Sequence, residues 1–145
     1  MSPLISEFCN FAQLKEKMRK KVIRVFVVDD SIELLVTVCS LLETQSEVEV
    51  VGTARHALDI LEQAQELRPD LLITNLHMPL LNGLECALRL REKMPAMRFV
   101  LFADSTGPLT PEAFRASGAD GFIDKRHLAE GLSREVRRLF PRSAD

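Results

Sequence analysis

The stretch VIRVFVVDDS at residues 22–31 is an almost uninterrupted apolar run followed by two carboxylates. Six of its first seven residues are apolar and most of these are β-branched, which predicts a strand buried on both faces of a sheet. Asp29 and Asp30 end the run, and Ser31 is a suitable N-cap for a following helix. The stretch therefore predicts a strand that passes into a helix, with an acidic pair at the junction.

The rest of the chain repeats this alternation of short apolar runs and helical patterns. We expect further strands at residues 48–51, 71–73, 99–102 and 121–123, with Gly52 as the exit of the second strand. We expect helices over residues 34–42, 57–67, 84–91, 111–116 and 128–139. Five such units in a chain of 145 residues predict one α/β domain, with a parallel sheet covered by helices on both faces. In such a sheet, ligands bind at the carboxyl ends of the strands.

A segment of different character precedes this domain. Its apolar residues have helical spacing, and a basic run follows them. The apolar set is Ile5, Phe8, Phe11, Leu14 and Met18, and the basic set is Lys15, Lys17, Arg19, Lys20 and Lys21. We predict an amphipathic, basic helical extension over residues 1–21, a domain over 22–141 and a tail over 142–145. The extension has three open roles, which are packing on its own domain, forming a dimer and docking on a partner.

Composition excludes several classes of protein. The net charge of −2 gives no field that would attract nucleic acid to this chain. Cys9, Cys39 and Cys86 are odd in number and lack metal-ligand spacing, so we expect neither a disulfide framework nor a thiolate metal site. No apolar run has the length of about 18 residues that a membrane helix needs, and the basic cluster follows the apolar residues instead of preceding them as in a secretory signal. We predict a cytoplasmic protein without membrane association.

The acidic pair is the first candidate site. Asp29 and Asp30 follow an apolar run, where unpaired charge is costly, so a cation is expected beside them. Mg²⁺ suits carboxylate oxygens, and Lys125 follows the last predicted strand. The alternative is that both carboxylates only cap the next helix and interact with its dipole. His56, His77 and His127 lack ligand spacing and are not predicted to bind metal.

Further motifs occur at the ends of other predicted strands. The sequence has Asn75-Leu-His-Met-Pro79 with Gly83 beyond it, then Gly118-Ala119, and finally Lys125. Together with the acidic pair, these motifs resemble the receiver domains of two-component response regulators, over residues 22–140. Residues 118–125 resemble receivers that precede LuxR-type DNA-binding domains. The resemblance implies a flavodoxin-like, doubly wound five-stranded parallel sheet of order 2-1-3-4-5, with helices on both faces.

The resemblance also implies a phosphotransfer site. In this family, a carboxylate after the third strand accepts a phosphoryl group from a phosphohistidine, and the acidic pair holds Mg²⁺. A lysine contacts the phosphoryl group, while a Thr or Ser after the fourth strand and an aromatic residue on the fifth respond to it. Asp29 and Asp30 match the metal pair, Lys125 the lysine and Phe122 the aromatic residue.

Three positions of that site do not match. Asn75 stands at the acceptor position, and a neutral amide is not among the usual nucleophiles. The amide oxygen of Asn75 and the backbone of His77 remain as further metal ligands, but the missing charge lowers the expected affinity for Mg²⁺. Ala103 stands at the Thr/Ser position, and Ser105 replaces its hydroxyl only if the loop shifts. Asp104 stands where the family has a small residue, and it would repel phosphate and compete for Lys125.

We therefore expect a phosphorylation-independent protein-interaction module of two-component signalling that is not an enzyme. Its partner is expected to be a histidine kinase, an output protein or a second copy. The binding surface is expected to be either the N-terminal helix or the face formed by residues 111–116, 121–123 and 128–139. That face includes Phe114, Arg115, Phe122, Arg126, Arg134, Arg137 and Arg138. We interpret the last three arginines as a solvated stripe.

Two alternatives remain for the function. Asn75 is either natural or an engineered change of Asp in a phosphorylatable receiver. The sequence is also compatible with the N-terminal part of a LuxR-type transcriptional regulator, in which case a further domain would bind DNA.

Overall fold

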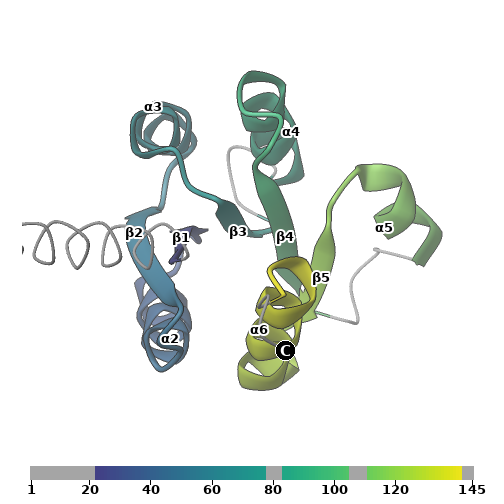
Figure 1. Ribbon diagram of the computed structural model, residues 1–145. Helices are drawn as coiled ribbons and strands as arrows, with labels where there is room; N and C mark the ends of the chain where they lie inside the picture. The colour runs from purple at the N-terminus through teal and green to yellow at the C-terminus, as the bar shows by residue number, and fades with distance from the viewer. Residues whose placement is uncertain (1–21, 78–82, 105–110, 142–145) are drawn as a thin grey trace, which may run out of the picture.

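Five parallel strands form a single sheet in the computed structural model, in the order β2-β1-β3-β4-β5 (Figure 1). The structure describes residues 22–77, 83–104 and 111–141, apart from the side chains of residues 57, 58, 111 and 113. The strands are β1 (Ile23–Val28), β2 (Val48–Ala54), β3 (Leu71–Asn75), β4 (Arg98–Ala103) and β5 (Gly121–Asp124). The predicted flavodoxin-like fold and its strand order are confirmed.

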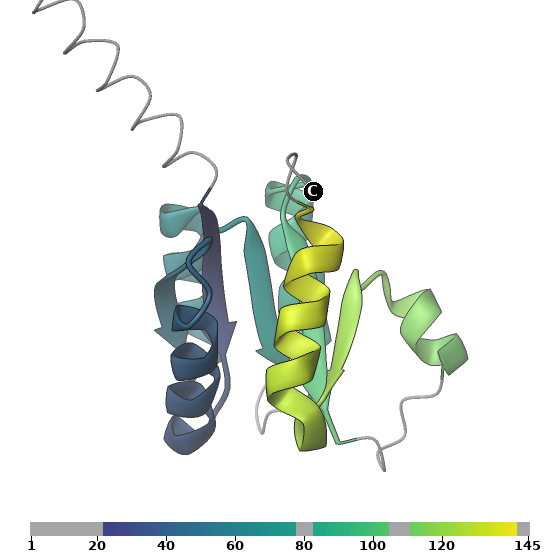
Figure 2. The ribbon, with the colours of Figure 1, turned by 60° about the horizontal axis from the view of Figure 1, so that its bottom comes forward.

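Helices cover both faces of this sheet. They are α2 (Ile32–Glu43), α3 (Ala57–Leu67), α4 (Gly83–Lys93), α5 (Pro111–Ser117) and α6 (Leu128–Leu139), and the short 3-10 turn η1 (Lys125–His127) leads into α6. Figure 2 shows α2 and α6 side by side on one face, and Figure 1 shows α3 and α4 on the other. Each face has its own apolar core, one built with α2 and α6 and the other with α3 and α4.

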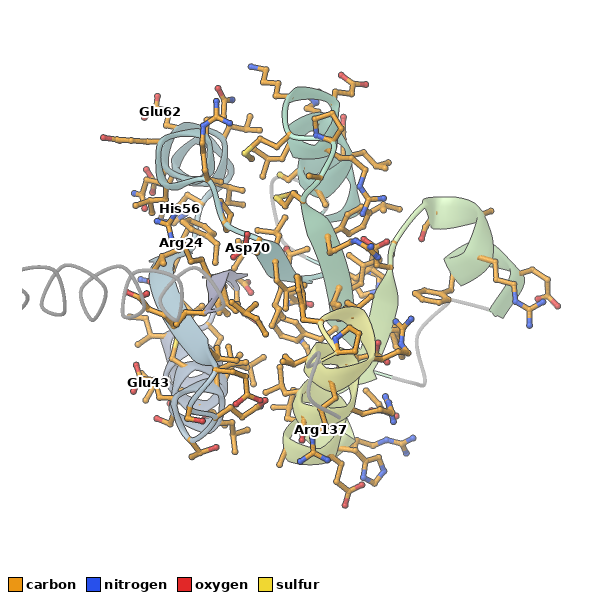
Figure 3. The ribbon with its side chains drawn as sticks, viewed as in Figure 1. Arg24, Glu43, His56, Glu62, Asp70 and Arg137 are labelled. Carbon is orange, nitrogen blue, oxygen red and sulfur yellow. The ribbon has the colours of Figure 1, made fainter. Side chains whose placement is uncertain are left out.

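Strand β1 contributes to both cores. Val25 and Val27 pack with α2 and α6, whereas Phe26 and Val28 pack on the opposite face. All four side chains are fully buried, as the apolar run predicts. Arg24 is the exception within the strand. Its backbone N–H donates to Asp70 Oδ2 at 2.9 Å, and the two side chains lie near each other in Figure 3.

The predicted exit of β2 at Gly52 is wrong, because the strand continues to Ala54. Val25 pairs with Val50 and Phe26 pairs with Gly52, so Val51 is an extra residue and forms a β-bulge. A Cβ atom at Gly52 would lie 2.8 Å from Leu67 Cδ1 and 2.8 Å from Phe26 Cε2. Gly52 therefore permits close packing within a strand and does not end it.

The other predicted ends are closer to the structure. Arg68 has a φ of 50°, a left-handed conformation that ends α3 immediately before Pro69. Strand β3 extends two residues beyond the expected Ile73, which places Asn75 inside the sheet.

Cys86 is buried and Cys39 is half-buried, and both are free thiols. The predictions for residues 1–21 and 142–145, and those for Cys9, Pro79 and Ser105, fall outside the described residues.

Gly83 begins α4 against the end of β3. Its N–H donates to Leu76 O at 3.2 Å, and a Cβ atom there would lie 2.0 Å from the backbone oxygen of Asn75. We expect Gly83→Ala to lower the free energy of unfolding by about 3 kcal/mol, because backbone atoms cannot yield as a side chain does. Urea denaturation measures this loss. Glu92→Ala, an exposed change on the same helix, is the control and should stay within about 0.5 kcal/mol.

Candidate functional site

The acidic pair lies at the carboxyl end of β1, as predicted. Asp29 is only 1% exposed, and its Oδ1 accepts a hydrogen bond of 2.7 Å from the N–H of Ser31. Its other oxygen, Oδ2, is buried and has no hydrogen-bond partner among the described residues. Ser31 in turn caps α2, since its Oγ accepts from Leu34 N at 3.3 Å. The N-cap predicted for this helix, Ser31, is therefore present. One oxygen of the Asp29 carboxylate is left without a hydrogen-bond partner among the described residues.

Arg55 holds the second member of the pair in place. Its Nε and Nη2 both donate to the backbone carbonyl of Asp30, each at 3.2 Å. Sequence reasoning missed this contact. The sequence position of Arg55 could have indicated that it lies near the acidic pair. It directly follows β2, and parallel strands bring their carboxyl ends to one edge of the sheet.

The electrostatics of Asp29 follow from its burial. Desolvation raises the pKa of the Asp29 carboxyl, and the neighbouring Asp30 raises it further. The hydrogen bond from Ser31 and the positive charge of Lys125 act in the opposite direction, but they do not outweigh burial. The site is therefore short of positive charge.

Lys125 lies at the start of η1, where β5 ends. Its Nζ is 5.6 Å from the centroid of the Phe102 ring, and its charge acts on Asp29. The prediction that strand order brings Lys125 beside the acidic pair is consistent with this placement. In the described part of the chain, no ion pair joins Lys125 to Asp30 or Asp104.

Asn75 ends β3 beside the acidic pair. The sheet register pairs Val28 with Thr74, so Asp29 and Asn75 are the next residues of two neighbouring strands. Asn75 is 3% exposed, and its Oδ1 accepts from the N–H of His77 at 3.3 Å. The His77 side chain is exposed, and its backbone contributes to the site through this hydrogen bond.

The remaining predicted residues lie on β4 and β5 or directly after β4. Ala103 ends β4 and is 1% exposed, and Asp104 next to it is exposed. Phe122 packs edge-on against Phe114 of α5, with ring centroids 6.0 Å apart. Sequence reasoning did not predict that Arg126 forms an ion pair of 3.0 Å with Asp124 at the end of β5.

This donor set fits a hard cation such as Mg²⁺. The unsatisfied Oδ2 of Asp29, the Asp30 carboxylate and the Asn75 amide oxygen are all oxygen ligands of the kind that Mg²⁺ accepts. Within residues 22–77, 83–104 and 111–141, no cluster of three or more His, Cys, Asp or Glu side chains is placed to hold a metal ion. Water or a bound anion would have to complete the coordination sphere.

Comparison with known proteins identifies the family. The family described as response regulator receiver domain matches residues 25–137. The chain belongs to the response regulator receiver family. Receiver domains typically bind Mg²⁺ and interact with kinases and output proteins, which agrees with the position of the acidic pair at the carboxyl end of the sheet.

Several curated proteins are similar to this receiver domain. It is 39% identical over 119 residues to a protein-glutamate methylesterase/protein-glutamine glutaminase of Thermotoga maritima, covering 80% of this chain and 34% of that protein. It is 31% identical over 120 residues to the response regulator protein VraR of Staphylococcus saprophyticus, covering 81% of this chain and 56% of VraR. The chain thus spans between a third and somewhat over half of these two relatives.

Solved structures agree with this assignment. The response regulator domain of Thermotoga maritima CheB has a TM-score of 0.70 and 33% identity, with 84% of this chain and 98% of that one covered. A LuxR-family response regulator from Aurantimonas has a TM-score of 0.74 at 23% identity, with 82% and 85% covered. The expected likeness to LuxR-type regulators is therefore present at the level of the fold. No helix in the described ranges is long and apolar enough to span a bilayer.

The unsatisfied Asp29 carboxylate predicts an unusual pH dependence of stability without divalent cations. Because its pKa is raised above the ordinary value of 3.8, the folded state binds a proton more tightly than the unfolded state. The resulting stabilisation is complete below the unfolded pKa and is lost as the pH rises through the folded pKa. We expect Asp29→Asn to remove this loss and to raise the free energy of unfolding near pH 7 by about 1–2 kcal/mol, measured in EDTA.

Glu62→Gln is the matched control, because Glu62 is an exposed carboxylate on α3 (Figure 3). Its free energy of unfolding should change by less than about 0.5 kcal/mol. A destabilised Asp29→Asn variant, or one with the same pH dependence as the natural chain, would contradict the assignment.

Proposed function

We propose that this receiver domain acts in two-component signalling without being phosphorylated, as a protein-interaction module with no catalytic activity of its own. The observation that carries the proposal is the buried, neutral amide of Asn75 at the end of β3, directly beside the acidic pair. This is the place where the family resemblance puts the phosphate-accepting carboxylate.

The chemistry of the amide supports this proposal. A carboxylate attacks phosphorus through an anionic oxygen, whereas the amide oxygen is neutral and the amide nitrogen is not basic. The Oδ1 atom of Asn75 is also hydrogen-bonded to the N–H of His77. Both effects oppose the formation of an acyl phosphate at this position.

The end of β4 supports it independently. Ala103 stands where the resemblance places the Thr or Ser that responds to phosphorylation, and its methyl group offers no hydrogen bond. Asp104 is exposed next to it, and its negative charge would oppose an incoming phosphoryl group. Ser105, the only nearby hydroxyl considered as a replacement, is outside the described residues.

We further propose that Mg²⁺ binding is weaker than is usual in this family. Asp29 and Asp30 would hold the ion, with the Asn75 amide oxygen as a neutral third ligand. A bound Mg²⁺ would supply positive charge to the pocket. The chain's own residues set the affinity, since replacing a carboxylate by an amide removes one negative charge from the ligand set.

A protein partner is the remaining route for a signal. The candidates are a histidine kinase, an output protein or a second copy, through the N-terminal segment or the face formed by α5, β5 and α6. On that face, Arg134 and Arg138 both bind the buried Glu135, the former at 3.4 Å and the latter at 2.5 Å. Arg137 instead points away from the domain (Figure 3). All three side chains are nonetheless exposed, which supports our interpretation of the three arginines as a largely solvated stripe.

Phosphorylation by acetyl phosphate tests the proposal directly. We expect no added phosphoryl mass on the natural chain after incubation with acetyl phosphate and Mg²⁺. Asn75→Asp should gain one phosphoryl group, which hydroxylamine removes because it is an acyl phosphate. The same variant should bind Mg²⁺ about tenfold more tightly or better, since one further charge acts on the ion at short range.

Asn75→Gln is the control for that gain, because it keeps the amide and changes only the side-chain length. A hydroxylamine-labile phosphoryl group on the natural chain would overturn the proposal. So would an Asp codon at position 75 in the native gene, since Asn75 would then be engineered.

A second candidate is a regulatory domain of a longer protein. The observation that favours it is that the methylesterase and VraR are both longer than the region shared with this chain. In that case the receiver domain would control an attached catalytic or DNA-binding domain through its contacts. Sequencing the native gene beyond codon 145 distinguishes this candidate from an independent module.

A further inference from the structure

An open groove runs along the outer flank of α2 at the β2 edge of the sheet. Its volume is about 560 Å³. Helix α2 supplies one wall, and the end of β2 with the start of α3 supplies the other. The lining includes Ile32, Val36, Cys39 and Glu43 on the first wall and Thr53 and His56 on the second.

The α2 wall is apolar although it faces solvent. Ile32 is 56% exposed and Val36 is 59% exposed, and Cys39 continues the same stripe one turn further. Leu35, Val38 and Leu42 are the buried residues of the helix, and Leu35 also lines the groove. Among the described residues, the only other exposed large apolar side chain is Leu88 on α4. The flank of α2 is thus a continuous apolar strip that the described part of the chain leaves uncovered.

The end of the groove beside the carboxyl terminus of α2 is acidic. Glu43 lies at the carboxyl end of α2 and points outward on the side where β2 forms the edge (Figure 3). Glu47 follows in the connection to β2. The N–H of Ile23 donates to the backbone oxygen of Glu47 at 2.7 Å, so the chain enters β1 at this same place. Residues 15–21, with their five basic side chains, are therefore attached beside the acidic end of the groove.

We propose that the N-terminal segment of the same chain, residues 8–21, occupies this groove as an amphipathic helix. Starting from β1, the segment would lie along α2 with the same chain direction. Phe11, Leu14 and Met18 are then spaced over seven residues, which matches the seven residues from Ile32 to Cys39. At 1.5 Å of rise per residue, both stripes span about 10 Å, so each apolar side chain has a counterpart.

Charge fixes the direction of this docking. The basic residues nearest β1 meet Glu43 and Glu47, while the apolar residues further back in the sequence lie along Val36 and Ile32. The reverse direction would place lysines against the apolar strip. Oppositely charged groups at one end and apolar contacts along the length are the usual pattern by which an amphipathic helix binds a groove.

Covalent attachment favours this occupant over a second copy or a separate protein. The segment is joined to β1 within a few residues of the groove, so its effective concentration there is on the order of millimolar or higher. A separate partner needs to exceed that concentration or bind more tightly. The proposal does not depend on whether Asn75 accepts phosphate.

Trypsin cleavage of the full chain tests the docking, because five cleavage sites lie in residues 15–21. Val36→Glu places a charge on the apolar strip and should release the segment. We expect cleavage in residues 15–21 to become about tenfold faster, the factor that corresponds to about 1.4 kcal/mol of lost binding. Leu88→Glu is the matched control, since it adds the same charge at an exposed apolar residue on α4, and it should leave the rate unchanged.

Circular dichroism establishes that both variants keep the fold, which is expected because both side chains are exposed. Equal cleavage rates in the natural chain and in Val36→Glu would overturn the proposal. Protection that disappears on dilution would also overturn it, because the occupant would then be a second copy.

A cross-link identifies the occupant independently. In a Cys9→Ser chain, Met18→Cys should form a disulfide with the native Cys39 on mild oxidation, within a single monomer. Cys86 is fully buried and does not compete. Glu16→Cys lies on the opposite side of the predicted helix and should cross-link at least about tenfold more slowly. A disulfide found only between two chains, or equal rates for positions 16 and 18, would sink the assignment.

Discussion

Strand β1 lies between β2 and β3 and is covered by helices on both faces, so the polar groups at its end are held in a poorly solvated environment. This constraint organises the carboxyl end of the sheet. Ser31 binds one oxygen of Asp29 and caps α2, Arg55 binds the Asp30 carbonyl, and the charge of Lys125 reaches the pair from β5. One oxygen of Asp29 remains without a partner in the described residues. The site therefore combines two carboxylates with incomplete compensation.

Much of this arrangement could be predicted from the sequence. The apolar run before Asp29 and the recurring strand–helix rhythm were sufficient for a parallel sheet, and the motifs at the strand ends were sufficient for the family. Asn75 and Ala103 could be assigned because their place depends only on strand order and spacing. The position of Gly52 was misinterpreted, because glycine marks both strand ends and sites of close packing. Only the contacts with Leu67 and Phe26 distinguish the two.

Other features depend on three-dimensional contacts that no local pattern encodes. The hydrogen bonds from Arg55 to Asp30 join residues 25 positions apart, and position after β2 indicates only that Arg55 lies at the same edge of the sheet. The close approach of Gly83 to the Asn75 carbonyl is another example. The packing of Phe122 on Phe114 likewise depends on where α5 lies beside β5. Sequence reasoning placed Gly83 in the loop before α4 and Phe122 on β5, but it did not single out Arg55 and could not describe any of these contacts.

Arg55 has a consequence of its own, because its guanidinium group holds the Asp30 carbonyl while its side chain also lines the groove beside α2. A molecule in the groove would therefore contact a side chain that is hydrogen-bonded to the backbone of the acidic pair. If binding in the groove changes the affinity of the acidic pair for an ion, the ion changes the affinity of the groove by the same factor, because linkage between equilibrium binding events is reciprocal. Arg55 is the residue that would carry such coupling, since it contacts both the groove and the backbone of the acidic pair.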